Sequence, residues 1–151
     1  MTALLISPSL LQRIHRQAVR EYPQECCGIL VGRLGKEKRV EKNFPTKNRE
    51  HLRGCDRYAI DGRDFLRVDR EARKAGREIL GFYHSHPDGP SLPSSVDLHR
   101  AWNEYSYLIV SVIEGKDPSS RSWVLEPQER SFREERLRII PRKQFREGSY
   151  A

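Results

Sequence analysis

The sequence predicts an α/β fold in which a single domain forms a mixed β-sheet flanked by helices. Short apolar runs typical of strands alternate along the chain with segments of helical periodicity, and several strand pairs lie close enough to form hairpins. The length of 151 residues suits one domain rather than two. Hydrophobic residues make up 36% of the chain, which is enough to build a core.

The N-terminal third predicts a strand, a helix and a hairpin. After the apolar residues 3–6, Ser7 and Pro8 are typical of a helix start, because a hydroxyl caps the first turn and proline fits its opening position. Pro23 forces the residue before it out of helical geometry, so this helix should end near residue 21. The run 28–31 predicts a buried strand whose partner is 38–43, with Gly32 and Gly35 flanking the tight turn between them.

The middle of the chain predicts a second helix and a central strand. Residues 44–56 are polar and predict a loop, and 57–60 a further strand. Asp61 can cap a helix of about 15 residues that Gly76 closes. Residues 79–83 predict the strand that follows.

The C-terminal part continues the alternation. Three prolines restrict residues 87–93 to a loop, and a short helix should follow from residue 94 to about residue 104. Further apolar runs predict strands at 107–113, 122–125 and 137–140. The domain should therefore span residues 1–141, with a frayed, charged tail at 142–151.

Composition excludes several protein classes. No apolar run approaches the roughly 20 residues that span a bilayer, and no signal peptide is recognisable. Three cysteines, two of them adjacent, form no closed disulfide framework, which indicates a reducing compartment. We therefore expect a cytoplasmic protein without a membrane partner.

The chain carries 28 Lys and Arg against 21 Asp and Glu, a formal net charge of +7. Acidic residues interrupt the basic ones almost everywhere, which is typical of a solvated face rather than of a nucleic-acid surface. An alternative is a basic DNA-associated domain. Its strongest support is the segment 129–146, which contains Arg130, Arg133, Arg136, Arg138, Arg142, Lys143 and Arg146.

The chemically informative segment begins at the end of the strand predicted at 79–83. His84 and His86 are two residues apart, so in an extended chain both imidazoles point to the same side. After the proline-rich loop, Asp97 falls in the first turn of the next helix. Two histidines and one carboxylate are typical ligands of a catalytic zinc, whose fourth position holds water.

Two further residues complete a hydrolytic site. Glu25 lies just before a buried strand, where a carboxylate has no obvious structural purpose, and it is the candidate base for the attacking water. Ser94 could hydrogen-bond the oxyanion that forms at the attacked carbonyl. Each signal has an ordinary alternative, since Ser94 and Asp97 also form a capping-box pattern and Glu25 alone would be a surface acid.

Together these residues resemble the JAMM (MPN+) metalloprotease family. The family pattern is an upstream glutamate, then His-Ser-His, seven residues, Ser, two residues and Asp. Here it is met without departure by Glu25, His84, Ser85, His86, Ser94 and Asp97. The resemblance covers roughly residues 3 to 125. It implies a cytidine-deaminase-like fold and one Zn²⁺ per chain, held by His84, His86 and Asp97, with Glu25 as general base and Ser94 stabilising the tetrahedral intermediate.

The compact chain is similar to the small stand-alone prokaryotic members of that family, especially those that process sulfur carriers. The resemblance implies a peptidase or isopeptidase that hydrolyses an amide bond at the C-terminal glycine of a ubiquitin-like sulfur-carrier protein, releasing cysteine or a conjugate. It implies a place in cysteine biosynthesis and little room for the insertions that grip ubiquitin chains. The alternative of the same fold is a non-catalytic MPN-type interaction scaffold.

Other candidate residues fit structural roles better. Cys26 and Cys27 could be nucleophiles or ligands, but buried thiols explain them more simply. A nucleobase deaminase would need His-x-Glu and Pro-Cys-x-x-Cys, and both motifs are absent from the sequence. His15, His51 and His99 are isolated and are expected to be surface or packing residues. Trp102 and Trp123 are expected in the core, and the alternative for both is to line a substrate groove.

Overall fold

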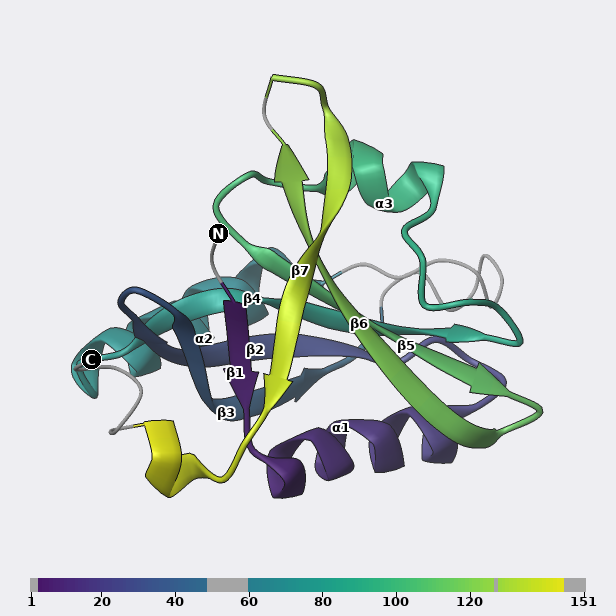
Figure 1. The fold of residues 1–151 in the computed structure, drawn as a ribbon, viewed down its shortest axis with the longest axis horizontal. Coiled ribbons are helices and arrows are strands. Elements are labelled where there is room, and N and C mark those ends of the chain that lie inside the picture. Colours follow the sequence, from purple (N-terminus) through teal and green to yellow (C-terminus); the bar gives the residue numbers. More distant parts are fainter. Residues whose placement is uncertain (1–2, 49–59, 127, 146–151) are drawn as a thin grey trace.

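The computed structural model describes residues 3–48, 60–126 and 128–145 of the chain (Figure 1). Seven strands, three α-helices and a final 3-10 turn, η2, follow one another in the described part. In chain order they are β1 (Ala3–Ile6), α1 (Pro8–Glu21), β2 (Cys27–Leu34), β3 (Lys38–Thr46), α2 (Gly62–Lys74), β4 (Glu78–Pro87), α3 (Ser95–Arg100), β5 (Ser106–Ile113), β6 (Lys116–Glu126), β7 (Ser131–Ile139) and η2 (Arg142–Gln144).

The strands form one mixed sheet, which confirms the predicted α/β class. Their order is β1-β3-β2-β4-β5-β6-β7, and β1 closes the sheet into a barrel by pairing in parallel with both β3 and β7. The β4–β5 pair is also parallel, whereas β2–β3, β2–β4, β5–β6 and β6–β7 are antiparallel. The sequence indicated the mixed sheet but not its closure.

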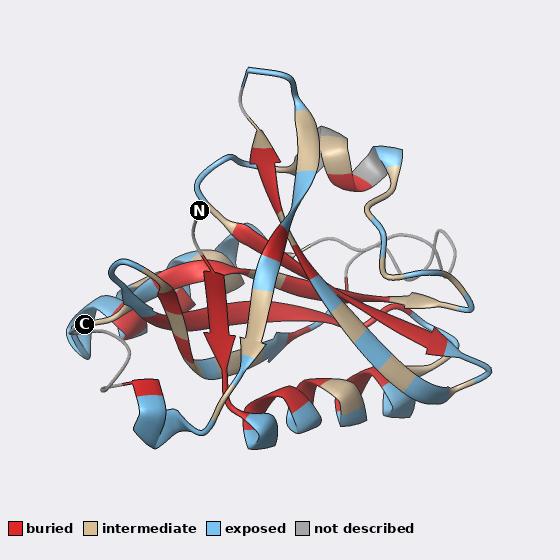
Figure 2. Ribbon diagram, in the orientation of Figure 1, coloured by how far each residue is buried: buried red, intermediate tan, exposed pale blue. Residues whose placement is uncertain are grey.

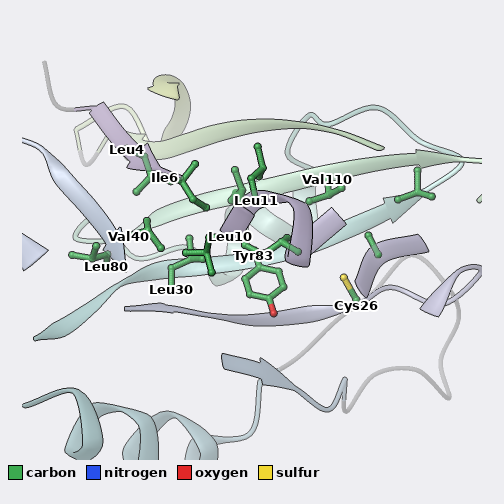
Figure 3. Packing of buried hydrophobic residues seen from close by; sticks show 14 residues of the cluster. Leu4, Ile6, Leu10, Leu11, Cys26, Leu30, Val40, Leu80, Tyr83 and Val110 are labelled. Carbon is green, nitrogen blue, oxygen red and sulfur yellow. The ribbon is translucent and has the colours of Figure 1, made fainter. Parts of the chain in front are cut away.

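Helices α1 and α2 cover opposite faces of the central strands. Leu10, Leu11 and Ile14 of α1 pack against strand residues such as Leu30 and Tyr83, which face the same buried cluster (Figure 3). Val68 and Ala72 of α2 pack against the alternate β2 side chains, Ile29 and Val31. Strand β2 is therefore buried on both faces, as the continuous burial of its first six residues shows (Figure 2).

The predicted helix caps are present. The Ser7 hydroxyl accepts a hydrogen bond from the Leu10 N–H at 3.2 Å, and Pro8 occupies the first position of α1. Asp61 accepts from the Arg63 N–H at 2.8 Å. Gly76 follows α2 with φ of +72°, a conformation that glycine adopts without strain. These local signals fix where both long helices begin and where α2 ends.

Several boundaries differ from expectation because pairing overrides local sequence. Strand β3 extends to Thr46 into the expected loop, since that stretch pairs with β2 from Cys27 onward. Strand β4 continues to Pro87 because its parallel pairing with β5 continues to Pro87. Helix α3 ends at Arg100, four residues early, because Ala101 adopts an extended conformation.

The last strands are longer than their apolar runs. Strand β6 covers Lys116–Glu126, and its buried residues lie in its second half; β7 covers Ser131–Ile139 and is mostly intermediate or exposed, with the charged Glu135 buried. The strand expected at 57–60 falls mostly outside the described residues, and Ile60 itself is not in a strand.

The C-terminal segment differs from the expected frayed tail in its described part. Residues 142–144 form η2, and Phe145 is only 3% exposed because it packs against Ala3 and Leu5 of β1. This apolar contact attaches residues 142–145 to the barrel. Residues 146–151 lie outside the described residues. Within the described part of the chain, no helix has the length and apolar character needed to cross a membrane.

Candidate active site

Strand β4 brings the two histidines of the His-Ser-His segment together. It lies between β2 and β5, with His84 opposite Cys27 on one side and Ile109 on the other. The Nε2 atoms of His84 and His86 lie 3.0 Å apart, as the period-two alternation of a strand requires. His84 is fully buried, whereas the His86 side chain is 15% exposed. The pair therefore has one protected and one accessible member.

Helix α3 brings Asp97 to the same place. Asp97 Oδ1 lies 3.2 Å from Nε2 of His84, and Oδ2 lies 3.3 Å from Nε2 of His86. The carboxylate also accepts the Ser94 N–H at 2.8 Å, while the Ser94 hydroxyl accepts the Asp97 N–H at 3.1 Å. This is a complete capping box. The capping interpretation of the Ser-x-x-Asp pattern is therefore confirmed, and the same cap fixes the carboxylate that faces the histidines.

Glu25 completes the cluster from the connection between α1 and β2. It is 1% exposed, and one ligand atom of each of Glu25, His84 and His86 lies within 4.8 Å of the others. Asn48 donates its side-chain amide to the Glu25 carbonyl oxygen at 3.0 Å. The neighbouring Cys26 and Ser85 are also joined, because the Cys26 N–H donates to the Ser85 hydroxyl at 2.9 Å and the Ser85 N–H donates to the Cys26 carbonyl at 3.0 Å.

The proline-rich loop after β4 is tied down at several points. Asp88 accepts the Tyr22 hydroxyl at 2.7 Å and the Glu114 N–H at 2.7 Å. The Ser111 hydroxyl donates to the Gly89 carbonyl at 2.6 Å, and the Trp123 indole donates to the Ser91 carbonyl at 3.0 Å. These bonds hold the segment that connects the histidines to Asp97.

Hydrogen bonding selects the form of His86. Its Nδ1 lies 2.9 Å from the Pro90 carbonyl oxygen, which can only accept, so Nδ1 carries the hydrogen. In the neutral ring the lone pair is then on Nε2, the atom that faces His84 and Asp97. Metal-binding histidines are commonly oriented in this way by a carbonyl on the other ring nitrogen.

Burial and the Asp97 carboxylate shift the pKa values of the site. Burial lowers the pKa of His84 despite its hydrogen bond with Asp97. For His86, burial acts in the same direction, but the bonds to Asp97 and Pro90 outweigh it and raise the pKa. Burial opposes ionisation of Asp97, yet hydrogen bonds from both histidines hold its pKa below the ordinary range. Asp97 is therefore an anion facing two imidazoles.

This donor set fits a zinc ion. Zinc binds imidazole nitrogen and carboxylate oxygen at about 2.0–2.1 Å, and a tetrahedron of that size has edges of about 3.3 Å. The two histidine Nε2 atoms lie 3.0 Å apart, and each faces a different oxygen of Asp97, at 3.2 Å from His84 and 3.3 Å from His86, so the spacings are close to that edge length. Two neutral imidazoles and one carboxylate leave one position for a further ligand. His84, His86 and Asp97 are therefore the residues that could hold the metal.

The cysteines beside Glu25 are structural thiols. Burial raises the pKa of Cys26 to about 12 and that of Cys27 to about 11. Both side chains are fully buried and are thiols rather than thiolates at neutral pH. The structure therefore gives no support to a cysteine nucleophile.

The other candidates are placed as follows. His15 is a packing residue, bonded to the Ser120 hydroxyl at 2.6 Å. Trp123 is partly buried, but Trp102 is 67% exposed, so its expected core position is wrong. Trp102 lies two residues after the end of α3. His51 and the side chain of His99 lie outside the described residues.

Sequence reasoning missed two positioning residues. The sequence predicts a polar loop around Asn48, whereas this residue is only 6% exposed. Ser85 enters the sequence prediction only as a member of the motif. Their bonds to the Glu25–Cys26 backbone join segments far apart in sequence. In the sequence Asn48 is one polar residue among several after β3, and nothing in its neighbours indicates a role. Only the pairing of Thr46 with Cys27 brings Asn48 to the site.

Comparison with known proteins gives a consistent result. Residues 7–126 match the family model of prokaryotic homologs of the JAB domain. The chain is 32% identical to a probable TtuB-protein conjugate cleaving protease of Thermus thermophilus, covering 70% of this chain and 68% of the relative. It is 33% identical to a desampylase of Haloferax volcanii, covering 68% and 73%. It is 32% identical to a CysO-cysteine peptidase of Mycobacterium tuberculosis, covering 76% and 75%.

Solved structures agree with the fold. A protein from Desulfitobacterium hafniense superimposes with a TM-score of 0.79 at 27% identity, over 91% of this chain and 93% of that one. A JAB1/MPN domain protein from Archaeoglobus fulgidus gives a TM-score of 0.58 at 18% identity, over 92% and 97%. The second likeness concerns the fold alone, and it confirms the expected JAMM/MPN architecture.

Proposed function

Because the chain belongs to the prokaryotic homologs of the JAB domain and is a JAMM-type hydrolase, we propose that it is a zinc-dependent peptidase of ubiquitin-like carrier proteins. The bond cleaved is the amide that joins the C-terminal glycine of the carrier to cysteine or to another amine. The observation that carries this proposal is the convergence of Glu25, His84, His86 and Asp97 from three separate segments.

The names of the relatives support the substrate class. One relative is named for cleaving TtuB-protein conjugates and another for a CysO-cysteine substrate. In each name the substrate is a named protein joined to a second group. Because these relatives are named as peptidases and proteases, they favour an enzyme over the scaffold alternative.

We assign the proton transfer to Glu25. The separation of up to 4.8 Å between its ligand atom and those of the histidines leaves room for one water molecule. Zinc bound by the histidines and Asp97 would lower the pKa of water and polarise the scissile carbonyl. Glu25 takes the proton of the attacking water and passes it to the leaving amine. Its almost complete burial excludes bulk water from that transfer.

We assign stabilisation of the transition state to Ser94. Its oxygen accepts the Asp97 N–H, so the hydroxyl hydrogen remains to be donated. A hydroxyl that donates to the carbonyl oxygen of the attacked bond stabilises the negative charge that develops there.

The outer edge of β3 offers a path for the carrier tail. In the described chain, β1 pairs with β3 only at Lys38 and Arg39, so the rest of β3 has no strand partner on that side. Pro45 is typical of such an edge, because proline cannot donate a ladder hydrogen bond. This edge ends at Thr46, which pairs with Cys27 opposite His84. An extended tail that adds a strand here would lie three strand positions from β4, about 14 Å away, so its last residues would have to turn past the Thr46–Cys27 end to reach the histidines.

The proposal is tested with a carrier protein that ends in Gly-Gly-Cys. We expect the zinc-loaded chain to release cysteine, measured by mass spectrometry of the carrier. Glu25→Gln should lower turnover by about 10² to 10⁴-fold, because the proton acceptor is lost while the shape is kept. Arg13→Gln, on the exposed face of α1, is the control and should retain full turnover. Equal turnover in Glu25→Gln and the parent protein would remove Glu25 from the mechanism.

A further inference from the structure

A second hollow lies at the end of the barrel opposite the candidate active site. It measures about 820 Å³ and is lined by Arg33, Arg39, Glu41, Arg77, Arg142, Lys143 and Phe145. These residues come from the facing ends of β2 and β3, from the start of β4 and from η2. Figure 1 shows η2 and the β2–β3 turn at one end of the molecule and the tip of β4 at the other. We call this hollow the basic pocket.

The basic pocket gathers five cationic groups around one carboxylate. Glu41 contacts Arg33 and Arg142, with N–O distances of 3.6 Å each, and Arg77, with which it forms a short hydrogen bond. Burial disfavours the charged form of Glu41, but Arg77, Arg142 and Arg33 together hold its pKa below the usual range. Glu41 is thus fully ionised and already shared among three guanidinium groups.

Two cations of the basic pocket are not matched in this way. Arg39 and Lys143 form no ion pair with any carboxylate in the described part of the chain. With five positive groups and one negative group, the lining has a formal surplus of four positive charges. Such a surplus in a concave site raises the local positive potential and attracts anions.

We propose that the basic pocket binds a di- or triphosphate group. Guanidinium groups present paired N–H donors that match the oxygens of phosphate, and four of the seven lining residues are arginines. A ligand with three or four negative charges matches the surplus, which a singly charged anion does not. Among the described residues of the lining Phe145 is the only apolar one, so an apolar ligand finds little surface there. The volume lies in the range of small-molecule sites.

The location separates this ligand from the peptidase substrate. Arg33 stands six residues along β2 from Cys27, which is about 20 Å at about 3.3 Å per residue. A diphosphate in the basic pocket therefore touches neither Glu25 nor the histidines. The proposed phosphate site and the proposed peptidase activity can each hold or fail without the other.

The shared chemistry is the phosphate chain, which can be free or part of a nucleotide. Calorimetric titration of the whole chain at constant ionic strength distinguishes these sources with pyrophosphate, tripolyphosphate, ATP without magnesium, and adenosine. We expect saturable 1:1 binding of pyrophosphate or tripolyphosphate. Binding of ATP at similar affinity, without binding of adenosine, would identify the phosphates as the recognised part. Absence of saturable binding by pyrophosphate and tripolyphosphate at millimolar concentration would overturn the proposal.

The test variant combines Arg39→Gln with Lys143→Gln. The control variant combines Arg13→Gln with Arg16→Gln on α1, which removes the same number of charges away from the basic pocket. The test variant should weaken phosphate binding at least tenfold and the control variant by less than twofold. Without ligand, the test variant should keep or raise the Tm, because it relieves repulsion. Equal weakening of phosphate binding in both double variants would show that net charge alone governs binding, which would overturn the proposal. The parent protein is also tested for binding to a 20-base-pair DNA. Tight binding of this DNA that pyrophosphate does not displace would overturn the proposal in favour of a nucleic-acid surface.

Discussion

At the scale of single residues, Ser94 combines a helix cap with the oxyanion contact that we propose. Its oxygen accepts the Asp97 N–H and so caps α3, which leaves its hydrogen available for the proposed bond to a substrate oxygen. The cap holds Asp97, whose two carboxylate oxygens face the two histidines. Removing the hydroxyl therefore affects both the helix start and the proposed oxyanion contact, and the two effects need separate variants.

Ser94→Gly separates them, because glycine at an N-cap costs only a few tenths of a kcal/mol, whereas alanine costs about 1 kcal/mol. We expect both variants to lower kcat by about 10² to 10³-fold, since neither donates to the oxyanion. Only Ser94→Ala should lower the free energy of unfolding clearly. Activity that follows stability, with Ser94→Gly close to the parent protein, would restrict Ser94 to capping.

The convergence of His84, His86 and Asp97 was predictable because these residues lie close together in the sequence. His84 and His86 share a face through strand alternation, and Asp97 follows from a capping-box pattern. Asn48 and Ser85 were not predictable as positioning residues, since their bonds to the Glu25–Cys26 backbone depend on tertiary contacts. The same applies to the exposure of Trp102, which lies two residues after the end of α3.

At the scale of elements, the parallel pair β4–β5 carries the histidines and depends on a close backbone approach. A Cβ atom placed on Gly81 would lie 2.0 Å from the Ser106 carbonyl oxygen. No side chain fits there unless the two strands move apart. The pairing that starts at Gly81 and Ser106 continues to His84 and His86, so a displacement at its start is transmitted toward the site.

We expect Gly81→Ala to lower the free energy of unfolding by about 3 kcal/mol or more, because overpacking at backbone cannot be relieved by a rotamer change. Urea denaturation measures this change. Gly62→Ala is the control, since a Cβ on Gly62 meets no atom within 4 Å and alanine favours a helix. A loss below 1 kcal/mol in Gly81→Ala would show that the strands are not held this closely.

Element types were predictable where one pattern dominates and less so where pairing decides. The apolar run 107–113 and the capped helix at Asp61 have strong local signals. Strand β7 is rich in charged residues over Ser131–Ile139, and its apolar run predicted only the last part. The extension of β4 through Pro87 depends on β5 and has no local signal.

At the scale of the whole molecule, a buried polar network crosses the barrel. Lys38 donates to the Ser106 hydroxyl at 2.7 Å and lies 3.8 Å from Glu135, which also accepts from Ser106 at 2.7 Å and from Ser122 at 2.8 Å. Burial lowers the pKa of Lys38, and Glu135 counteracts that shift. Because β2 and β4 separate β3 from β5 in the sheet, the bond from Lys38 to Ser106 must span the interior.

We expect Glu135→Ala to lower the free energy of unfolding by about 3–5 kcal/mol, since it leaves a buried ammonium without its carboxylate. Adding Lys38→Met should restore a large part of that loss, because the uncompensated charge is removed as well. A double-mutant cycle in urea measures the coupling. Strictly additive effects would show that Lys38 and Glu135 do not depend on each other.

The central claim is that His84, His86 and Asp97 hold a zinc ion while Glu25 stays outside the ligand set. The most direct test is zinc per chain, measured by elemental analysis of protein purified without chelator. We expect about one zinc in the parent protein and in Glu25→Gln, and almost none in folded His84→Ala and Asp97→Ala. Absence of zinc from the folded parent protein after zinc is added back, or loss of zinc in Glu25→Gln, would contradict the claim.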